Sequence, residues 1–249
     1  MQSLYTNAWQ TNYRGCWKTH IKIFLHLDNK TDKALDIACG TGLSTKALLE
    51  IATEVYGTDA SQQMLNFASL TDKINYSCAS AEQQPFSDSS FDLITVSSGV
   101  HWFEIDKFLI EANRLLKSKS WLVLYENYFI SEMVGKDNFT NWFPNVYLKK
   151  YPSPSRNDSY SWTNENLNPT NFTLVTEERF KNAIVFNKKQ LALYFTTQSN
   201  IISAVEKGET TYEQVESWLD KQLASFFDND DTEQTINYGN WIKFIQRAN

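Results

Sequence analysis

A chain of 249 residues with 42% apolar and 21% charged residues can bury a large core, which excludes a disordered or fibrous protein. Its formal net charge of -6 argues against a protein that binds nucleic acid by neutralising phosphates. Cys16, Cys39 and Cys78 lack metal-like spacing, and we expect them to be reduced thiols. The N-terminal residues show no signal-peptide core, and no apolar run is long enough to span a bilayer, so we expect a cytoplasmic protein.

Short apolar strands alternate with amphipathic helical segments up to about residue 127. The expected strands are residues 33–38, 54–59, 73–80, 90–98 and 121–127, with helices at 43–52, 61–69 and 104–117. The helix at 104–117 is the clearest, because its apolar residues recur at helical spacing. This alternation predicts an α/β fold with a Rossmann-like, doubly wound and mostly parallel sheet.

The composition changes after residue 128. Four of the five prolines lie between there and residue 180, among many Asn, Ser, Tyr and Trp. So long an irregular segment favours a functional lid or a binding insertion. A strand at 179–187, a helical stretch at 188–206, a helix starting at Thr210 or Thr211, and an antiparallel last strand at 235–247 follow. Glu213 or Gln214 would complete a capping box at the start of that helix.

We therefore expect one domain over residues 1–249. Its cofactor-binding core would cover about 33–127, its lid or acceptor-binding insertion about 128–178, and its C-terminal helices and last strands about 179–249.

The segment LDIACGTG, residues 35–42, carries the first chemical signal. Gly40 and Gly42 lie between a buried strand and a helix, where glycines let the backbone approach a ligand closely. Asp59 stands at the end of the next strand, where a carboxylate can accept hydrogen bonds from two ribose hydroxyls. A tight turn without a ligand is the alternative interpretation.

Two residues argue against a nicotinamide cofactor at this loop. Thr45 occupies the place of the third glycine of a dinucleotide-binding motif, and Asp36 would repel a pyrophosphate. S-adenosylmethionine carries a sulfonium and an ammonium group and no phosphate, so it suits an acidic loop better. An NAD(P)-linked oxidoreductase on the same fold remains a rival.

Over roughly residues 33–127 the sequence resembles the class I S-adenosylmethionine-dependent methyltransferases. DIACGTG (36–42) resembles the family's glycine-rich motif, GTDASQQML (57–65) its acidic strand end and helix, and SAEQQPFSDSSFDLI (80–94) its adenine-contacting segment. The resemblance implies that S-adenosyl-L-methionine is the cofactor and S-adenosyl-L-homocysteine the product. The cofactor-binding residues that it implies are Tyr13, Arg14, Asp36, Ala38, Gly40, Gly42, Asp59, Ala60, Met64, Ser80, Ala81, Glu82 and Ser97.

Further segments resemble bacterial and fungal small-molecule enzymes of the trans-aconitate methyltransferase type. They are NYRG (12–15), SSGVHWFEIDKFLIEANRLLK (97–117) and FTTQSNIISAVEKGE (195–209). By this resemblance Arg14 would pair with the carboxylate of the cofactor, and the acceptor would be a small molecule.

His101 follows the fourth strand, at the sheet edge where α/β proteins bind ligands. Three roles are open: a general base, a donor of a fixed hydrogen bond, or packing with Trp102 beneath the cofactor. His20 and His26 are expected to be structural. Trp102, Tyr128, Trp142 and Tyr147, with Tyr151, Tyr160 and Trp162, either line an acceptor pocket or form the core of the insertion.

The sequence thus predicts in-line methyl transfer to a small molecule, with O-methylation of a carboxylate or hydroxyl favoured. No metal, nucleic acid or membrane is expected to take part. Besides the oxidoreductase, a protein that binds the cofactor without transferring its methyl group, as a cyclase or a scaffold, is the alternative.

Overall fold

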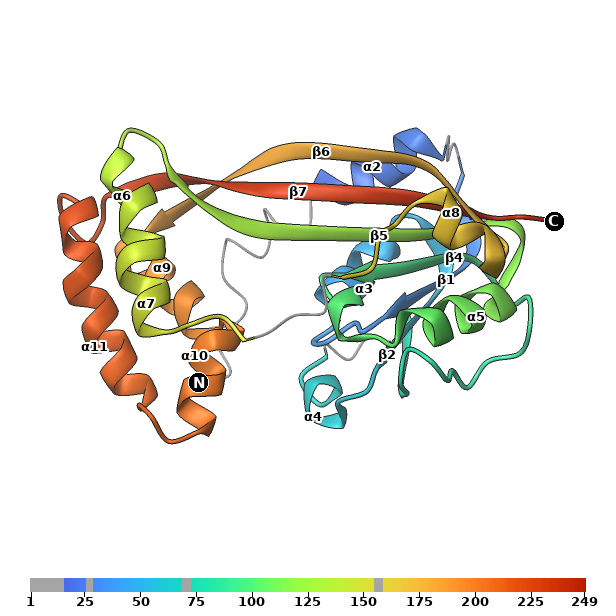
Figure 1. Ribbon diagram of the computed structural model, residues 1–249, viewed down its shortest axis with the longest axis horizontal. Helices are drawn as coiled ribbons and strands as arrows, with labels where there is room; N and C mark the ends of the chain where they lie inside the picture. The colour runs from blue at the N-terminus through green and yellow to red at the C-terminus, as the bar shows by residue number, and fades with distance from the viewer. Residues whose placement is uncertain (1–15, 26–28, 69–72, 155–158) are drawn as a thin grey trace. The chain divides into compact units, whose positions relative to one another are not determined.

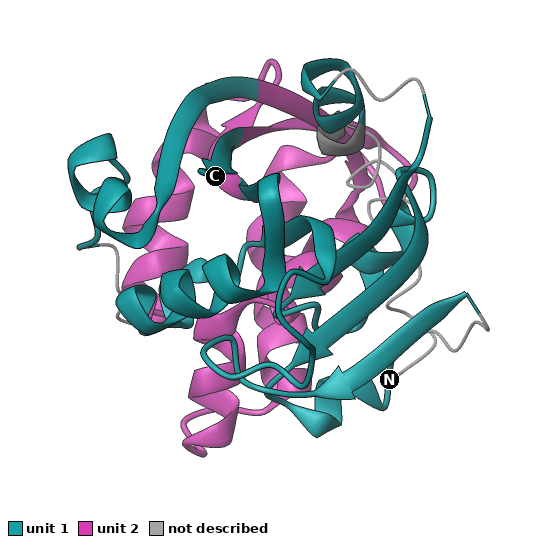
Figure 2. Ribbon diagram, turned by 90° about the vertical axis from the view of Figure 1, so that its right-hand side faces the viewer, with its two compact units in different colours: residues 1–127, 157–180, 240–249 teal, residues 128–156, 181–239 magenta. Residues whose placement is uncertain are grey.

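The computed structural model describes residues 16–25, 29–68, 73–154 and 159–249 (Figure 1). The chain divides into two compact units, shown in separate colours in Figure 2. Unit 1 comprises residues 1–127, 157–180 and 240–249, and unit 2 comprises residues 128–156 and 181–239. The predicted insertion at 128–178 does not coincide with unit 2, because residues 157–180 group with the core of unit 1.

The first four strands form a parallel sheet in the order β3-β2-β1-β4, as the alternation of elements predicts. Their bounds are Thr31–Ile37 for β1, Ala52–Asp59 for β2, Ile74–Cys78 for β3 and Phe91–Ser97 for β4. The second half of β1 is fully buried, as expected for a central strand covered on both faces. Because the strands are parallel, their carboxyl ends meet at one edge, and the loops that follow them lie together.

Three further strands extend the sheet beyond β4. They are β5 (Leu116–Met133), β6 (Phe172–Asn187) and β7 (Glu233–Arg247), and they complete the order β3-β2-β1-β4-β5-β7-β6. The β5-β7-β6 part is antiparallel, which confirms the predicted mostly parallel sheet with an antiparallel last strand. The strands predicted at 121–127 and 179–187 are parts of longer strands, and residues of both units belong to each of β5, β6 and β7.

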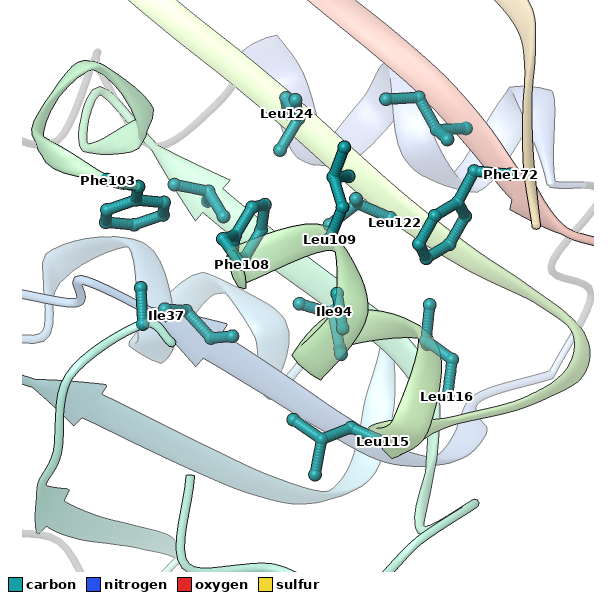
Figure 3. Packing of buried hydrophobic residues seen from close by; sticks show 14 of the residues in the cluster. Ile37, Ile94, Phe103, Phe108, Leu109, Leu115, Leu116, Leu122, Leu124 and Phe172 are labelled. Atoms are coloured by element: carbon teal, nitrogen blue, oxygen red, sulfur yellow. The ribbon is translucent and has the colours of Figure 1, made fainter. Parts of the chain in front are cut away.

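The helices of unit 1 include α2 (Cys16–Phe24), α3 (Leu43–Leu48), α4 (Gln62–Leu65), α5 (Ile105–Leu115) and α8 (Asn164–Leu167). Two 3₁₀ turns, η2 (Val100–Trp102) and η4 (Asn168–Thr170), accompany them. The apolar face of α5 carries Phe108 and Leu109, which pack with Ile37, Ile94 and Leu122 from the sheet (Figure 3). This packing fixes α5 against β1, β4 and β5.

Unit 2 contains α6 (Asp137–Trp142), the π-helix η3 (Phe143–Tyr147), α7 (Leu148–Lys150), α9 (Lys188–Thr196), α10 (Ser199–Glu206), α11 (Tyr212–Leu223) and the 3₁₀ turn η5 (Ala224–Phe226). The predicted helical stretch 188–206 is two helices, because the chain leaves the helix at Thr197 and turns extended at Gln198. A capping box joins Thr211 and Gln214 at the start of α11, so Gln214 rather than Glu213 is its second member.

The core of unit 2 is built mainly from aromatic rings. Phe139 stacks on Trp142 with ring centroids 5.4 Å apart, and Phe143 stacks on Tyr147 at 5.2 Å. Phe195 from α9 contacts Tyr147 at 4.6 Å. Such ring pairs add roughly 0.5–1.5 kcal/mol each beyond the area they bury, so this core stabilises unit 2 itself.

Candidate cofactor site

The loop after β1 turns sharply at three residues with left-handed backbone. They are Ala38 (φ 57°), Gly40 (φ 55°) and Gly42 (φ 75°). An alanine in this conformation is strained. Its methyl group is accommodated because residue 99 is a glycine, at which an added Cβ would lie 2.7 Å from the Ala38 Cβ. Ala38 and Gly99 therefore form a matched pair that brings the loops after β1 and β4 into contact.

Gly40 and Gly42 face different neighbours. A Cβ added at Gly40 would lie 3.4 Å from the Met64 Cε, the one atom of the described residues that it would meet within 4 Å. A Cβ added at Gly42 would overlap the Tyr76 hydroxyl and lie 2.8 Å from its Cζ. Gly57 on β2 makes room for the same ring. Gly42 thus has a packing reason of its own, and its predicted contact with a cofactor stays a prediction.

Asp59 joins the loops after β1 and β2. Its Oδ2 accepts a hydrogen bond from the Gly40 amide at 2.8 Å, and its Oδ1 accepts one from the Ser61 amide at 2.8 Å. The half-buried carboxylate also lines the pocket. Each carboxylate oxygen can accept a second hydrogen bond, so Asp59 retains the capacity to bind two ribose hydroxyls.

Asp36 lies behind the loop, fully buried. Its Oδ2 accepts hydrogen bonds from the hydroxyls of Ser44 (2.6 Å) and Thr45 (2.7 Å), and its Oδ1 accepts one from Thr95 (2.9 Å). Thr95 is also its register partner on β4. Burial raises the pKa of Asp36 to about 6, although the three hydroxyls counteract part of that effect.

These contacts give Asp36 a role that the sequence did not indicate. The carboxylate ties β1 to the first turn of α3 and to β4, and among the described residues it is not one of those lining the pocket. A predicted contact with the methionine end of the cofactor therefore stays a prediction. Ser44 and Thr95 were missed, because only the register of β1 and β4 and the start of α3 bring them to Asp36.

A pocket of about 520 Å³ opens at the carboxyl ends of the parallel strands. This volume lies within the usual range of small-molecule sites. The pocket is lined by Ala38 and Gly40 after β1, by Asp59, Ala60, Ser61 and Met64 after β2, by Ala79, Ser80, Ala81 and Glu82 after β3, and by Ser97, Ser98, Gly99, Trp102 and Phe103 at and after β4. The structure thus brings together most of the predicted cofactor-binding residues.

The charged side chains of this lining are Asp59 and Glu82, both acidic. Within the described part of the chain, no lysine or arginine lines the pocket. Two carboxylates without a cation produce a negative potential, which attracts a sulfonium or an ammonium group and repels a phosphate.

The wall after β3 is fixed at both ends. The Ala79 amide donates to the Asp59 carbonyl oxygen at 3.0 Å, and the buried Ala81 packs against the core. The Glu82 carboxylate accepts a hydrogen bond from the Glu104 amide at 3.0 Å, which ties the wall to the residue before α5. After the neighbouring strand β2, Met64 lines the pocket and is 42% exposed, as a residue that packs against a ligand in the bound state would be.

His101 and Trp102 belong to the turn η2 after β4. Their ring centroids lie 4.7 Å apart, so the two rings are in contact, and the role of this pair beneath a cofactor stays a prediction. Trp102 is 62% exposed and lines the pocket; among described residues, His101 is not part of that lining. The roles of His101 as a base or a hydrogen-bond donor stay predictions.

The other aromatic residues predicted for an acceptor pocket pack within their own units. Trp142 and Tyr147 belong to the buried aromatic core of unit 2, and the ring of Tyr128 occupies the space that a side chain at Gly239 would need. These contacts favour the alternative that the rings form a core. Tyr13, Arg14 and His26 lie outside the described residues.

His20 has the structural role expected from the sequence. Its Nδ1 lies 2.6 Å from the Glu178 Oε2, and its ring stacks on Phe180 with centroids 4.2 Å apart. Cys39 is buried and Cys78 exposed, and both are free thiols. In the described part of the chain, no group of three or more His, Cys, Asp or Glu is placed to hold a metal ion, and no helix there is both long and apolar enough to cross a membrane.

Part of the chain is similar in sequence to known methyltransferases. Residues 35–124 match the family described as "Methyltransferase domain". A Dictyostelium discoideum protein with a provisional methyltransferase assignment is 36% identical over 100 residues, which are 40% of this chain and 38% of that protein. A demethylmenaquinone methyltransferase of Bacteroides fragilis is 35% identical over 107 residues, covering 39% of this chain and 44% of the relative. The chain thus spans less than half the length of these curated relatives.

Solved structures show the same fold over nearly the whole chain. An Anaeromyxobacter dehalogenans chain, provisionally assigned as a type II methyltransferase, has a TM-score of 0.70 at 15% identity and covers 93% of this chain and 95% of its own. A [4+2]-cyclase has a TM-score of 0.54 at 17% identity, with 98% and 83% covered. Residues 35–124 therefore match a methyltransferase domain, the chain has the Rossmann-like fold of solved methyltransferase structures, and this match supports S-adenosylmethionine as the cofactor.

Proposed function

We propose that this protein transfers the methyl group of S-adenosylmethionine to a small molecule. The observation that supports this most is the acidic pocket at the ends of β1, β2 and β4, with Asp59 beside the Gly40 backbone. Asp59 would accept the two ribose hydroxyls. The apolar side chains of Met64 and Ala81 would contact the adenine ring, and Ser80 and Glu82 would border its edge.

When bound, the cofactor would supply a methyl group on a positively charged sulfur. The acceptor attacks the methyl carbon in line with the carbon–sulfur bond, and the sulfur leaves as S-adenosylhomocysteine. The residues of the chain have to hold the donor in place and exclude water, since a well-oriented displacement gains most of its rate from positioning. The matched pair Ala38 and Gly99 sets the spacing of the two loops between which the methionine end would lie. Trp102 offers an exposed ring face at this end of the pocket, and a ring face attracts a sulfonium.

The acceptor is proposed to be a small molecule methylated on oxygen, at a hydroxyl or carboxylate, as in the trans-aconitate methyltransferase type that the sequence resembles. A hydroxyl acceptor needs a base, and His101 would then take its proton. A carboxylate acceptor needs no base, but the described lining provides no cation to bind one. The demethylmenaquinone methyltransferases add a third class to be tested, a quinone-like ring.

Binding of the cofactor without methyl transfer is a second candidate function, because the chain also shares its fold with a [4+2]-cyclase. In such a protein the same pocket would bind the cofactor without releasing its methyl group. The fold alone does not separate this function from methyl transfer.

The test is incubation of the purified protein with S-adenosylmethionine labelled in its methyl group and a cell extract, followed by separation of small from large molecules. We expect label in a small-molecule fraction, and we expect Asp59→Ala to reduce its transfer about tenfold or more when the cofactor is below saturation. Label in protein or nucleic acid would overturn the small-molecule assignment. Cofactor binding without transfer in several extracts would favour the non-methylating alternative.

A further inference from the structure

One wall of the pocket, residues 79–82, is attached to α5 by a cluster of charged and polar groups outside the pocket. We propose that Glu111 and Arg114 of α5 act through Gln84 as positioning residues for this wall, and so set the affinity for the adenosine part of the cofactor. The inference rests on the proposed function for the ligand, and on the structure for the contacts.

The cluster begins with a bidentate ion pair on one turn of α5. The Arg114 Nε donates to the Glu111 Oε2 at 2.8 Å, and its Nη2 donates to the Glu111 Oε1 at 2.6 Å. Glu111 is 9% exposed. The contact with Arg114 keeps the pKa of Glu111 below its usual value despite burial, so the pair stays charged.

Both members of the pair hold the segment that follows the wall. The Glu111 Oε1 accepts a hydrogen bond from the Gln84 amide at 2.7 Å, and the Arg114 Nη2 donates to the Gln84 carbonyl oxygen at 3.3 Å. The Arg114 Nη1 also donates to the Phe86 carbonyl oxygen and to Asp88, both at 2.7 Å. The backbone of Gln84 is therefore held on both its donor and its acceptor side.

Gln84 passes this constraint to the pocket. Its side chain is 6% exposed, and its Nε2 donates to the Ser80 carbonyl oxygen at 2.6 Å. A bridge between Ser80 and Gln83 closes the same turn. Ser80 is thus connected to α5 through one buried amide, although neither Glu111 nor Arg114 is among the described residues that line the pocket.

A fixed wall matters for affinity because a flexible one must be ordered when the ligand binds. Arg114 is the kind of residue suited to this task, since its planar guanidinium donates to a carboxylate and to carbonyl groups at the same time. Two other contacts also hold the wall: the Ala79 amide on the Asp59 carbonyl oxygen, and the Glu82 carboxylate on the Glu104 amide. Removing the Gln84 contact alone should therefore loosen the wall without detaching it.

The test is the binding of S-adenosylhomocysteine, measured by calorimetry on the full chain. In Gln84→Met the link to Ser80 is removed and the ion pair remains; in Glu111→Leu/Arg114→Met the pair is removed as a whole, so no buried charge is left unpartnered. We expect the dissociation constant to rise about tenfold in both variants. Lys181→Met, which breaks an exposed ion pair with Glu132, should bind like the wild type, because neither of these two described residues lines the pocket or contacts the cluster.

Hydrogen exchange provides a readout that a purely structural role would not move. In both variants the amides of residues 79–84 should exchange faster while those of β1 and β4 do not, and saturating S-adenosylhomocysteine should slow them again. A lower melting temperature with unchanged affinity and unchanged exchange at 79–84 would overturn the inference. If the wild type fails to bind S-adenosylhomocysteine, the proposed function is wrong, and exchange at 79–84 in the unliganded proteins still decides whether the cluster positions the wall.

Discussion

Replacing Asp36 by asparagine is expected to change how the stability of the protein depends on pH. Asparagine matches aspartate in shape and carries no charge. Ser44, Thr45 and Thr95 all donate to Asp36. Two of these hydroxyls can rotate and accept hydrogen bonds from the NH₂ group of asparagine, while one continues to donate to its oxygen. The variant should therefore fold, without the unfavourable burial of a carboxylate.

The magnitude follows from the pKa of Asp36. Burial raises this pKa from 3.8 to about 6. Between the two values the folded protein binds more protons than the unfolded chain, so the contribution of Asp36 to the free energy of unfolding falls as the pH rises. At about 1.4 kcal/mol for each tenfold change in proton affinity, burial of the Asp36 carboxylate lowers the free energy of unfolding by roughly 3 kcal/mol in total. This loss is nearly absent below pH 3.8 and nearly complete above pH 6, and about half of it develops between pH 5 and pH 8.

The assay is urea unfolding of the wild type and Asp36→Asn from pH 5 to pH 8. Other titrating groups cancel in the difference between the two proteins, and the variant should gain stability relative to the wild type as the pH rises. A flat curve for Asp36→Asn, or one that falls with pH, would refute the reasoning, because the hydroxyls would then outweigh burial.

Three other changes have expected outcomes. Gly42→Ala should lower the free energy of unfolding, measured in urea, by more than about 2 kcal/mol, because it adds overlap with Tyr76 to left-handed strain. Gly135→Ala has the same strain and meets no described atom within 4 Å, so it should lower the free energy of unfolding by only about 1 kcal/mol. Equal losses in the two variants would contradict the packing argument. Thr211→Val should remove the capping box of α11 and lower stability by about 1 kcal/mol by the same measurement, and an unchanged unfolding midpoint would show that the box contributes nothing. His101→Ala should reduce methyl transfer to a hydroxyl acceptor by about 10²-fold or more at saturating cofactor, whereas an unchanged rate would exclude the base.

The parallel sheet and its glycine-rich loop were predictable because periodicity and local motifs encode them. Mainly apolar runs such as residues 33–38 identify central strands, and glycine between a strand and a helix identifies the turn. The capping box at Thr211 was predictable for the same reason, since its partners lie within one helical turn.

The partners of the buried groups were not predictable. Thr95 meets Asp36 only through the register of two strands that are far apart in the sequence. The same holds for Arg114, whose contacts with Gln84 and Phe86 depend on how α5 packs. Aromatic composition alone did not distinguish a ligand pocket from a core, as the burial of Trp142 and Tyr147 shows.

The measurement that tests the account most directly is calorimetric titration of the protein with S-adenosylhomocysteine and, separately, with NAD⁺. The acidic pocket predicts saturable binding of S-adenosylhomocysteine and no binding of NAD⁺, whose pyrophosphate the carboxylates would repel. Asp59→Ala should weaken the binding at least about tenfold, because hydrogen bonds to a charged group are each worth about 1.5–3 kcal/mol. Binding of NAD⁺ without binding of S-adenosylhomocysteine would contradict the account.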